Sequence, residues 1–223
     1  MNYLYNALQL KRLYQLKNLG IKYVPMVEKR VAASGASLPN SFKTLEQLVL
    51  QCHLCSLSKT RTKTVFGDGD INASLMFIGE GPGAQEDTTG RPFVGRAGEL
   101  LTKMIENAIE IPRSRTYIAN IVKCRPPNNR VPTPEEAYTC IPYLQKQIEL
   151  VSPSIIVALG ATAYHYLTGD KSGISKVRGE TIDMENYILI PTYHPSYLLR
   201  NPSVKKEVYQ DLLKVKRLLC ENC

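Results

Sequence analysis

Residues 73–98 read ASLMFIGEGPGAQEDTTGRPFVGRAG, an apolar run that passes directly into a loop rich in glycine. The run 73–79 shows no alternation of polar and apolar residues, which is typical of a strand buried on both faces. After the loop, residues 96–110 place apolar side chains on one helical face and charged side chains on the other. A buried strand, a loop and an amphipathic helix in this order predict the first unit of a parallel sheet covered by helices.

The same alternation continues through the rest of the chain. Strand-like apolar runs recur at 117–122, 154–159 and 187–191, and helical patterns recur at 134–150, 161–167 and 203–219. These elements predict a three-layer α/β/α sandwich with a central, mainly parallel four-stranded sheet. Ligands of such sheets bind beyond the carboxyl ends of the strands, so we expect a site among the loops 80–95, 123–130 and 192–200.

Composition limits the class of protein. The chain has 223 residues, 43% of them hydrophobic, and a formal net charge of +8. No apolar run approaches the roughly 18 residues of a membrane span. Residues 1–20 lack the uninterrupted apolar core of a secretory signal. We therefore expect a cytoplasmic protein that does not bind membranes.

Basic residues are concentrated at the start of the chain. Residues 1–60 contain eight Lys or Arg side chains against two Glu. A basic surface attracts polyanions, so nucleic acid is the first partner to consider, and a solvated helix face is the alternative. An amphipathic helix at 2–19 and a turn-rich linker at 32–40 predict an extension over 1–42 and a main domain over 43–223. The extension could tether DNA, bind a partner protein or pack against the main domain.

Three loops carry candidate site residues. In the glycine-rich loop, Gly81 permits close approach of the backbone to a ligand, and Phe93 offers a ring face to a planar ligand or serves as a hydrophobic plug. At the end of a strand, Asn120 presents a donor and an acceptor together, which match the amide edge of a pyrimidine, although such a residue can also simply cap its turn. His194 lies between Tyr193 and Pro195, and a neutral imidazole there can donate to a developing oxyanion.

The cysteine spacing allows two metal sites. Two CxxC pairs, Cys52 with Cys55 and Cys220 with Cys223, could together bind zinc. Alternatively, the first pair could join Cys124 and Cys140 in a four-thiolate site for an iron–sulfur cluster. Spacing alone leaves both open.

Taken together, these motifs resemble the family-four, iron–sulfur uracil-DNA glycosylases. The resemblance covers roughly residues 45–219. Its carriers are CHLC (52–55), GEGPG (79–83), EDTTGRPFVGRAG (86–98), NIVKCRPPNNR (120–130), Cys140 and HPSYLLR (194–200). It implies a uracil-DNA glycosylase-like fold and an enzyme that flips uracil out of single- or double-stranded DNA and hydrolyses its N-glycosidic bond. The abasic site that remains would initiate base excision repair. A monomer with a replication or repair protein as partner is a further expectation.

The resemblance also implies residue roles. A [4Fe-4S] cluster is expected on Cys52, Cys55, Cys124 and Cys140, which leaves the terminal CENC unexplained. Phe93 is expected to stack on the flipped uracil, Asn120 to read its amide edge and His194 to donate to its carbonyl. Glu80 is the nearest carboxylate to act on water or on the sugar cation, or else it holds the loop backbone.

The chain departs from the family-one enzymes at two glycines. Gly81 and Gly83 stand where those enzymes carry an Asp and a Tyr, so we expect reliance on leaving-group stabilisation, with Glu86 crowding the pyrimidine C5 position.

The resemblance also implies contacts with DNA. The expected contacts are Lys123 and Arg125 beside the cluster, Ser196 on phosphate, and Leu198 or Leu199 with Arg200 in the minor groove.

Four other interpretations are weighed against this one. A family-five glycosylase would carry a more apolar first motif in place of Glu80, and the DNA-crosslinking relatives carry a basic insertion after GRPFVG, which this chain lacks. A non-catalytic DNA-binding protein of the same fold is disfavoured by the presence of Phe93, Asn120 and His194. A zinc module built on both CxxC pairs would show no iron absorbance.

Overall fold

The computed structural model describes residues 38–221, which form a mixed α/β unit. The expected helix at 2–19, most of the linker at 32–40, and Cys223 lie outside the described residues. The division of the chain at residue 42 stays a prediction. No helix within residues 38–221 is long and apolar enough to cross a membrane.

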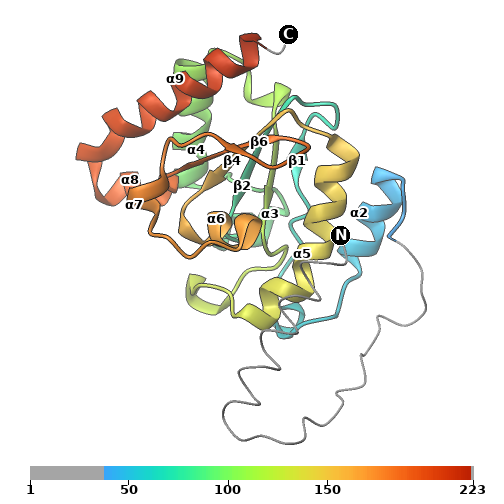
Figure 1. Ribbon diagram of the computed structural model, residues 1–223. Coiled ribbons are helices and arrows are strands. Elements are labelled where there is room, and N and C mark those ends of the chain that lie inside the picture. Colours follow the sequence, from blue (N-terminus) through green and yellow to red (C-terminus); the bar gives the residue numbers. More distant parts are fainter. Residues whose placement is uncertain (1–37, 222–223) are drawn as a thin grey trace, which may run out of the picture. The chain divides into compact units, whose positions relative to one another are not determined.

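A six-stranded sheet forms the centre (Figure 1). Its four parallel strands lie where the apolar runs predicted them: β2 (Leu75–Gly79), β3 (Tyr117–Asn120), β4 (Ile155–Leu159) and β6 (Ile188–Thr192). Two strands of two residues each, β1 (Asp68–Gly69) and β5 (Ile182–Asp183), add antiparallel edges that the sequence patterns did not predict. The strand order is β1-β3-β2-β4-β6-β5.

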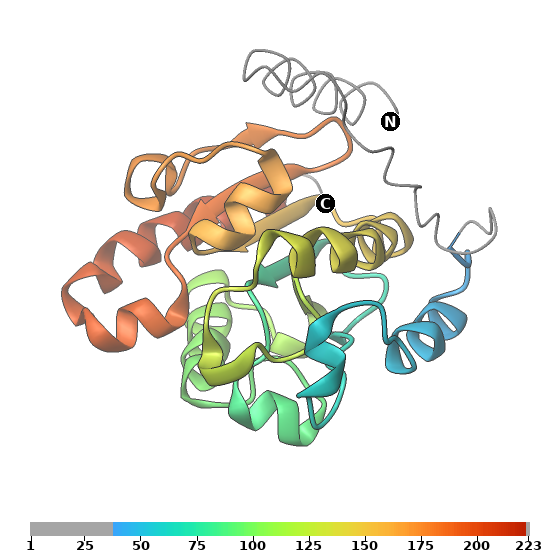
Figure 2. The same cartoon turned by 90° about the horizontal axis from the view of Figure 1, so that it is seen from below.

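Helices cover both faces of this sheet (Figures 1 and 2). Apolar side chains of α2 (Phe42–Leu50), α5 (Pro134–Val151), α6 (Ala161–Thr168) and α7 (Ile174–Val177) join one core cluster. Those of α4 (Arg96–Met104), α8 (Pro195–Arg200) and α9 (Lys205–Glu221) join a second cluster, and α3 (Ala84–Thr89) lies in the glycine-rich loop. The predicted helix 96–110 continues beyond α4 as a π-helical turn at Ile105–Ile109. The three-layer prediction is confirmed.

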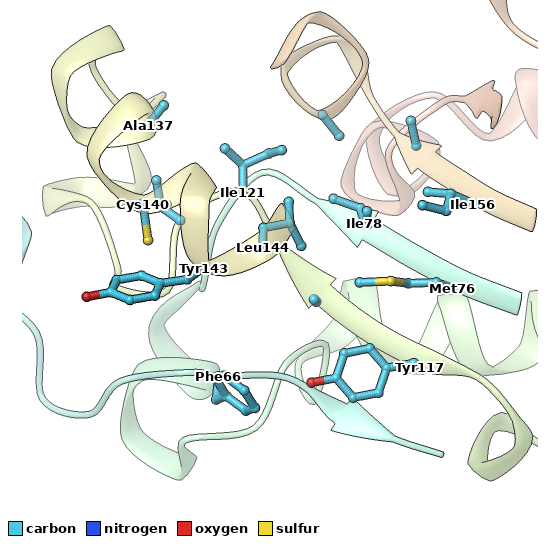
Figure 3. Close-up of a cluster of buried hydrophobic side chains, with 14 of the residues drawn as sticks. Phe66, Met76, Ile78, Tyr117, Ile121, Ala137, Cys140, Tyr143, Leu144 and Ile156 are labelled. Atoms are coloured by element: carbon cyan, nitrogen blue, oxygen red, sulfur yellow. The ribbon is translucent and has the colours of Figure 1, made fainter. Parts of the chain in front are cut away.

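Side chains alternate between the two clusters along each parallel strand. In β2, Met76 and Ile78 point to the first cluster, while Leu75 and Phe77 point to the second. Figure 3 shows the first cluster, with Cys140 and Tyr143 of α5 at one margin, on the side away from Ile156. Because both faces are buried, the strands lack the polar alternation of a half-exposed sheet.

The register aligns the carboxyl ends of the four parallel strands. Gly79 pairs with Asn120, and Leu159 pairs with Thr192. The loops that follow β2, β3, β4 and β6 therefore leave the same edge of the sheet, as the parallel topology requires.

Candidate active site

Gly79 marks the point where the first two loops meet. A Cβ atom at this position would lie 2.5 Å from Oδ1 of Asn120 and 2.6 Å from Cζ of Phe93. Both side chains therefore pack directly against the bare backbone of Gly79. The structure brings together the ring and the amide that the sequence singled out.

Asn120 is the last residue of β3 and is only 1% exposed. Its Oδ1 is buried and accepts no hydrogen bond from any residue in 38–221. An unsatisfied buried carbonyl costs about 1–3 kcal/mol, so it is rarely retained without a partner. A ligand N–H group that reached this atom would remove that cost.

Phe93 is held in a strained backbone conformation. Its φ is +51°, in the left-handed region that a bulky residue seldom adopts. Arg113 holds the turn, with Nη1 donating to the Phe93 carbonyl and Nη2 to the Pro92 carbonyl, both at 2.8 Å. Gly98 is required beneath it, because a Cβ there would lie 1.9 Å from the Phe93 carbonyl oxygen. The ring position is thus set by surrounding groups rather than by local preference.

His194 completes the group of three. Its ring centroid lies 5.7 Å from that of Phe93, with 34° between the ring planes. Nδ1 accepts from the backbone N–H of Ser196 (3.1 Å) and lies 2.8 Å from Ser196 Oγ. Because Nδ1 is an acceptor, a neutral ring carries its proton on Nε2. Burial, and secondarily Arg200, lower the pKa of His194 to about 4, so the ring is neutral at physiological pH.

Glu80 extends this group toward α6. Its Oε2 accepts a hydrogen bond from Thr162 Oγ1 at 2.5 Å. Burial raises the pKa of Glu80, and the bond from Thr162 opposes that shift. Gly160, which precedes α6, has a φ of +90° and approaches His194 so closely that a Cβ would lie 3.1 Å from the His194 Cβ. The loop before α6 therefore packs against the His194 loop.

Glu86 and Gly81 shape the glycine-rich loop. The Glu86 carboxylate accepts the backbone N–H groups of Gly83, Val94 and Gly95 at 2.9–3.1 Å. Its role in crowding the pyrimidine C5 position stays a prediction, whereas its loop-holding contacts are direct. A Cβ at Gly81 would lie 2.8 Å from Val122 Cγ2, so the loop passes close over the β3 segment at this point.

The side chains expected to contact DNA differ in their exposure to solvent. Lys123 was expected to face DNA, but it is 1% exposed, and its ammonium donates to the Asn120 carbonyl (3.0 Å) and to Gln147 Oε1 (2.5 Å). Leu198 is a core residue at 1% exposure, whereas Leu199 is 38% exposed. Both Lys123 and Leu198 are therefore corrected to internal residues.

The other four expected contacts, exposed Leu199 among them, stay predictions. Arg200 is exposed, and Arg125 is partly exposed with its Nε bonded to Asn129 Oδ1 at 2.8 Å. Ser196 is partly exposed and directs its hydroxyl to His194.

A cavity away from this group of residues is lined in part by the cysteines of one predicted quartet: Cys52, Cys55, Cys124 and Cys140. The cavity lies beside α2 and α5, on the face of the first core cluster. Burial raises the pKa of the Cys55, Cys124 and Cys140 thiols, that of Cys140 to about 12. The alternative zinc quartet would join Cys52 and Cys55 to Cys220, which lies on α9, a helix that packs on the opposite face of the sheet.

Hydrogen-bond donors point at these sulfur atoms. Arg61 Nη1 donates to Cys124 Sγ (3.1 Å), the Lys123 backbone N–H to Cys140 Sγ (3.3 Å) and the Tyr143 hydroxyl to Cys52 Sγ (3.5 Å). Such bonds suit thiolate ligands. Within residues 38–221, no three His, Cys, Asp or Glu side chains are grouped closely enough to hold a single metal ion. Four thiols with hydrogen-bond donors aimed at three of them are a donor set that suits an iron–sulfur cluster.

The sequence model of the uracil-DNA glycosylase superfamily matches residues 66–213, which include the loops that carry Phe93, Asn120 and His194. A type-4 uracil-DNA glycosylase of Thermotoga maritima is 49% identical over 179 residues, covering 78% of this chain and 93% of the relative. The chain belongs to the type-4 family of this superfamily.

Other relatives agree with this placement in the type-4 family. A type-4 uracil-DNA glycosylase of Sulfurisphaera tokodaii is 42% identical over 187 residues, covering 80% of this chain and 85% of the relative. A type-5 enzyme of Pyrobaculum aerophilum is 33% identical over 147 residues and covers only 58% of this chain and 64% of the relative. The match to type-5 enzymes is thus both weaker and shorter.

Sequence reasoning missed two residues of this type-4 site. Arg113 holds the Phe93 turn from a short connection between α4 and β3, where IPRSR looks like ordinary surface. Thr162 bonds Glu80 from the first turn of α6. A position in a loop at the carboxyl end of β4 is the one indication that could have identified Thr162.

Proposed function

We propose that this chain is a uracil-DNA glycosylase that takes uracil out of the base stack and hydrolyses the bond between the base and its sugar. The observation that carries this proposal is the unsatisfied buried carbonyl of Asn120, which lies with the Phe93 ring against Gly79, while His194 contacts the same ring. A planar pyrimidine beside Phe93 would stack on the ring and meet the amide with its edge.

The amide sets the choice of base. Uracil carries an N–H donor at N3 and a carbonyl acceptor at O4. Asn120 offers Oδ1 to that N–H and its NH₂ group to that carbonyl. Cytosine has an acceptor at N3, so with the amide in this orientation it would leave the buried Oδ1 without a donor. The pocket therefore favours uracil over cytosine through a cost imposed on the wrong base.

His194 stabilises the leaving base. As the glycosidic bond breaks, negative charge collects on the uracil, including its O2. A neutral imidazole with its proton on Nε2 can donate there, while Ser196 holds Nδ1 and so keeps the ring orientation. Glu80, near the His194 loop, is proposed to face the sugar cation or the attacking water.

The four cysteines that line the cavity beside α2 and α5 are proposed to hold a [4Fe-4S] cluster. When bound, the cluster supplies a structural cross-link rather than a step of the hydrolysis. Cys52 and Cys55 come from the segment before the sheet, Cys124 from the loop after β3 and Cys140 from α5. Joining them fixes the loop that begins at Asn120.

Exposed side chains near the site are proposed to hold the DNA. Leu199, with Arg200, would enter the gap left by the extruded base, and Arg125 would contact phosphate. A cytoplasmic location, a monomeric state and a repair or replication protein as partner stay predictions.

The test is uracil release from a uracil-containing oligonucleotide. Wild type should release uracil, and Asn120→Ala and His194→Ala should each be slower by roughly a hundredfold or more. A wild-type protein that binds the oligonucleotide without releasing base would instead support a non-catalytic DNA-binding role. Equal rates for wild type and both variants would remove these residues from the mechanism.

A further inference from the structure

Helix α6 connects the candidate active site to the surface beside it. Thr162 in its first turn bonds Glu80, and Tyr166 follows four residues later on the same helical face. Burial raises the pKa of Tyr166, and the neighbouring Tyr138, Glu136 and Glu80 raise it further. Tyr166 therefore lies near enough to sense the Glu80 charge, one turn further along the helix.

Tyr138 of α5 forms an aromatic pair with Tyr166. Their ring centroids are 5.5 Å apart and their planes are at 83°, an edge-to-face contact. Tyr166 is partly buried, whereas Tyr138 is 67% exposed. The contact restricts the Tyr138 ring while at least one of its faces stays open to solvent. A ring held in this way has already lost much of the side-chain entropy that stacking on a ligand would otherwise cost.

One guanidinium is bonded to α5, the helix that carries Tyr138. Arg130 binds both carboxylate oxygens of Glu136 at 2.7 and 2.8 Å, and 41% of its side chain remains exposed. Glu136 also accepts from Ser56 Oγ and from the Thr133 N–H, so its negative charge is well compensated. Arg130 is thus paired, but because Ser56 and Thr133 also donate to Glu136, the exposed side of the Arg130 guanidinium keeps part of its positive charge for an anion in solvent. An open aromatic ring and an exposed guanidinium at the same helix are the kind of combination that single-stranded nucleic acid binds.

We propose that Tyr138 and Tyr166 form a stacking platform for an unpaired base that neighbours the uracil on the same DNA strand. This inference rests on the proposed glycosylase function and adds that the platform favours single-stranded over duplex substrate. In single-stranded DNA the neighbouring base has no paired stack and can move onto the platform. In duplex DNA the same base is already stacked and paired, so the platform contributes less.

The experiment compares Tyr138→Leu with wild type on one uracil-containing sequence, offered single-stranded and as a duplex. Leucine keeps apolar bulk and removes the ring. The expected result is a KM raised about five- to hundredfold on the single strand, with a smaller rise on the duplex and an unchanged kcat. Tyr138→Phe should restore the wild-type KM, because stacking needs the ring and not the hydroxyl.

The matched control is Tyr209→Leu. Tyr209 is 45% exposed on α9, a helix that packs on the opposite face of the sheet. It should leave the single-strand KM unchanged. An equal KM for Tyr138→Leu and wild type on the single strand overturns the platform, as does an equal rise on both substrates or a loss confined to kcat.

Binding to a uracil-free single strand, followed by fluorescence anisotropy, separates the two proposals. Weaker binding by Tyr138→Leu than by wild type supports the platform even if wild type releases no uracil. Release of uracil by wild type together with unchanged binding by Tyr138→Leu leaves the glycosylase function in place and overturns the platform.

Discussion

Replacing Gly79 by alanine should disable the pocket while leaving the fold in place. The new Cβ would lie 2.5 Å from Asn120 Oδ1 and 2.6 and 2.9 Å from two ring carbons of Phe93, whereas ordinary contacts begin near 3.4 Å. Asn120 Oδ1 and the nearest ring carbon of Phe93 would each have to move away from the new Cβ by roughly 1 Å. Arg113 holds the Phe93 turn at two carbonyls, so the ring has little room to withdraw.

Two effects of different size follow from this geometry. Overpacking typically costs about 1–3 kcal/mol, and the reduced freedom of the unfolded chain returns about 0.4–1 kcal/mol, so the Gly79→Ala protein should still fold. A misplacement of about 1 Å in a catalytic site can lower the rate about a hundredfold. We therefore expect kcat/KM for uracil release to fall by about two orders of magnitude with a modest loss in the free energy of unfolding.

The assay is steady-state uracil release beside urea denaturation, with Gly173→Ala as control. Gly173 has a φ of −66°, and a Cβ there would meet nothing nearer than Ser175 Oγ at 4.0 Å. This control should match wild type in both measurements. A Gly79→Ala enzyme with more than about a third of wild-type kcat/KM would refute the reasoning that ring and amide must close on this backbone.

Three further predictions concern the site and the cysteines. NMR of His194 should show a proton on Nε2 and a titration midpoint near 4. Because the unfolded ring takes up its proton near pH 6.5, this residue should lower the free energy of unfolding as the pH falls from 6.5 toward 4. A native midpoint at 6.5 would contradict this. Arg113→Met leaves two backbone carbonyls without their donor, so it should cost about 1–3 kcal/mol in urea denaturation and raise KM by loosening Phe93, while an unchanged KM would count against that positioning role. Cys140→Ser should abolish the visible iron–sulfur absorbance of anaerobically purified protein and Cys220→Ser should preserve it. Absorbance that survives Cys140→Ser would contradict the assignment, and a wild-type protein without such absorbance would favour the zinc quartet.

The layers of the fold were predictable because burial on both faces imposes a simple pattern. Residues 75–79 and 155–159 are apolar throughout, and a strand that lies between two helical layers needs nothing else. The edge strands β1 and β5 were missed because two residues carry no periodicity. Their pairing depends on neighbours distant in sequence.

The meeting of the three loops was predictable for a related reason. Parallel strands direct their carboxyl ends to one edge, so Phe93, Asn120 and His194 had to emerge near each other. The depth of each side chain was not predictable in this way. Lys123 belongs to an unbroken buried segment that runs from Tyr117 to Cys124, yet in the sequence it appears as part of a basic, proline-rich loop.

Deciding which of Leu198 and Leu199 is exposed required the orientation of helix α8 in the fold. Adjacent residues on a helix differ by about 100° in direction, so one of two neighbouring leucines faces inward and the other outward. The helix α8 has only six residues, too few for an apolar period to reveal which. Packing against the second core cluster turns Leu198 inward and leaves Leu199, the residue proposed to enter the DNA, exposed.

The buried position of Lys123 gives the cysteine cavity a direct connection to base recognition. Its backbone N–H donates to Cys140 Sγ, and its ammonium donates to the carbonyl of Asn120. Burial lowers the pKa of Lys123 to about 8, which shows that its charge is costly to keep there. Gln147 offsets part of that cost. Its Oε1 accepts from the ammonium, while its Nε2 donates to Tyr117 Oη at 2.9 Å. Asn120, the residue proposed to read the base, is therefore bonded through its backbone by the residue that also bonds a cysteine, so disturbance of the cysteines should affect uracil recognition as well as stability.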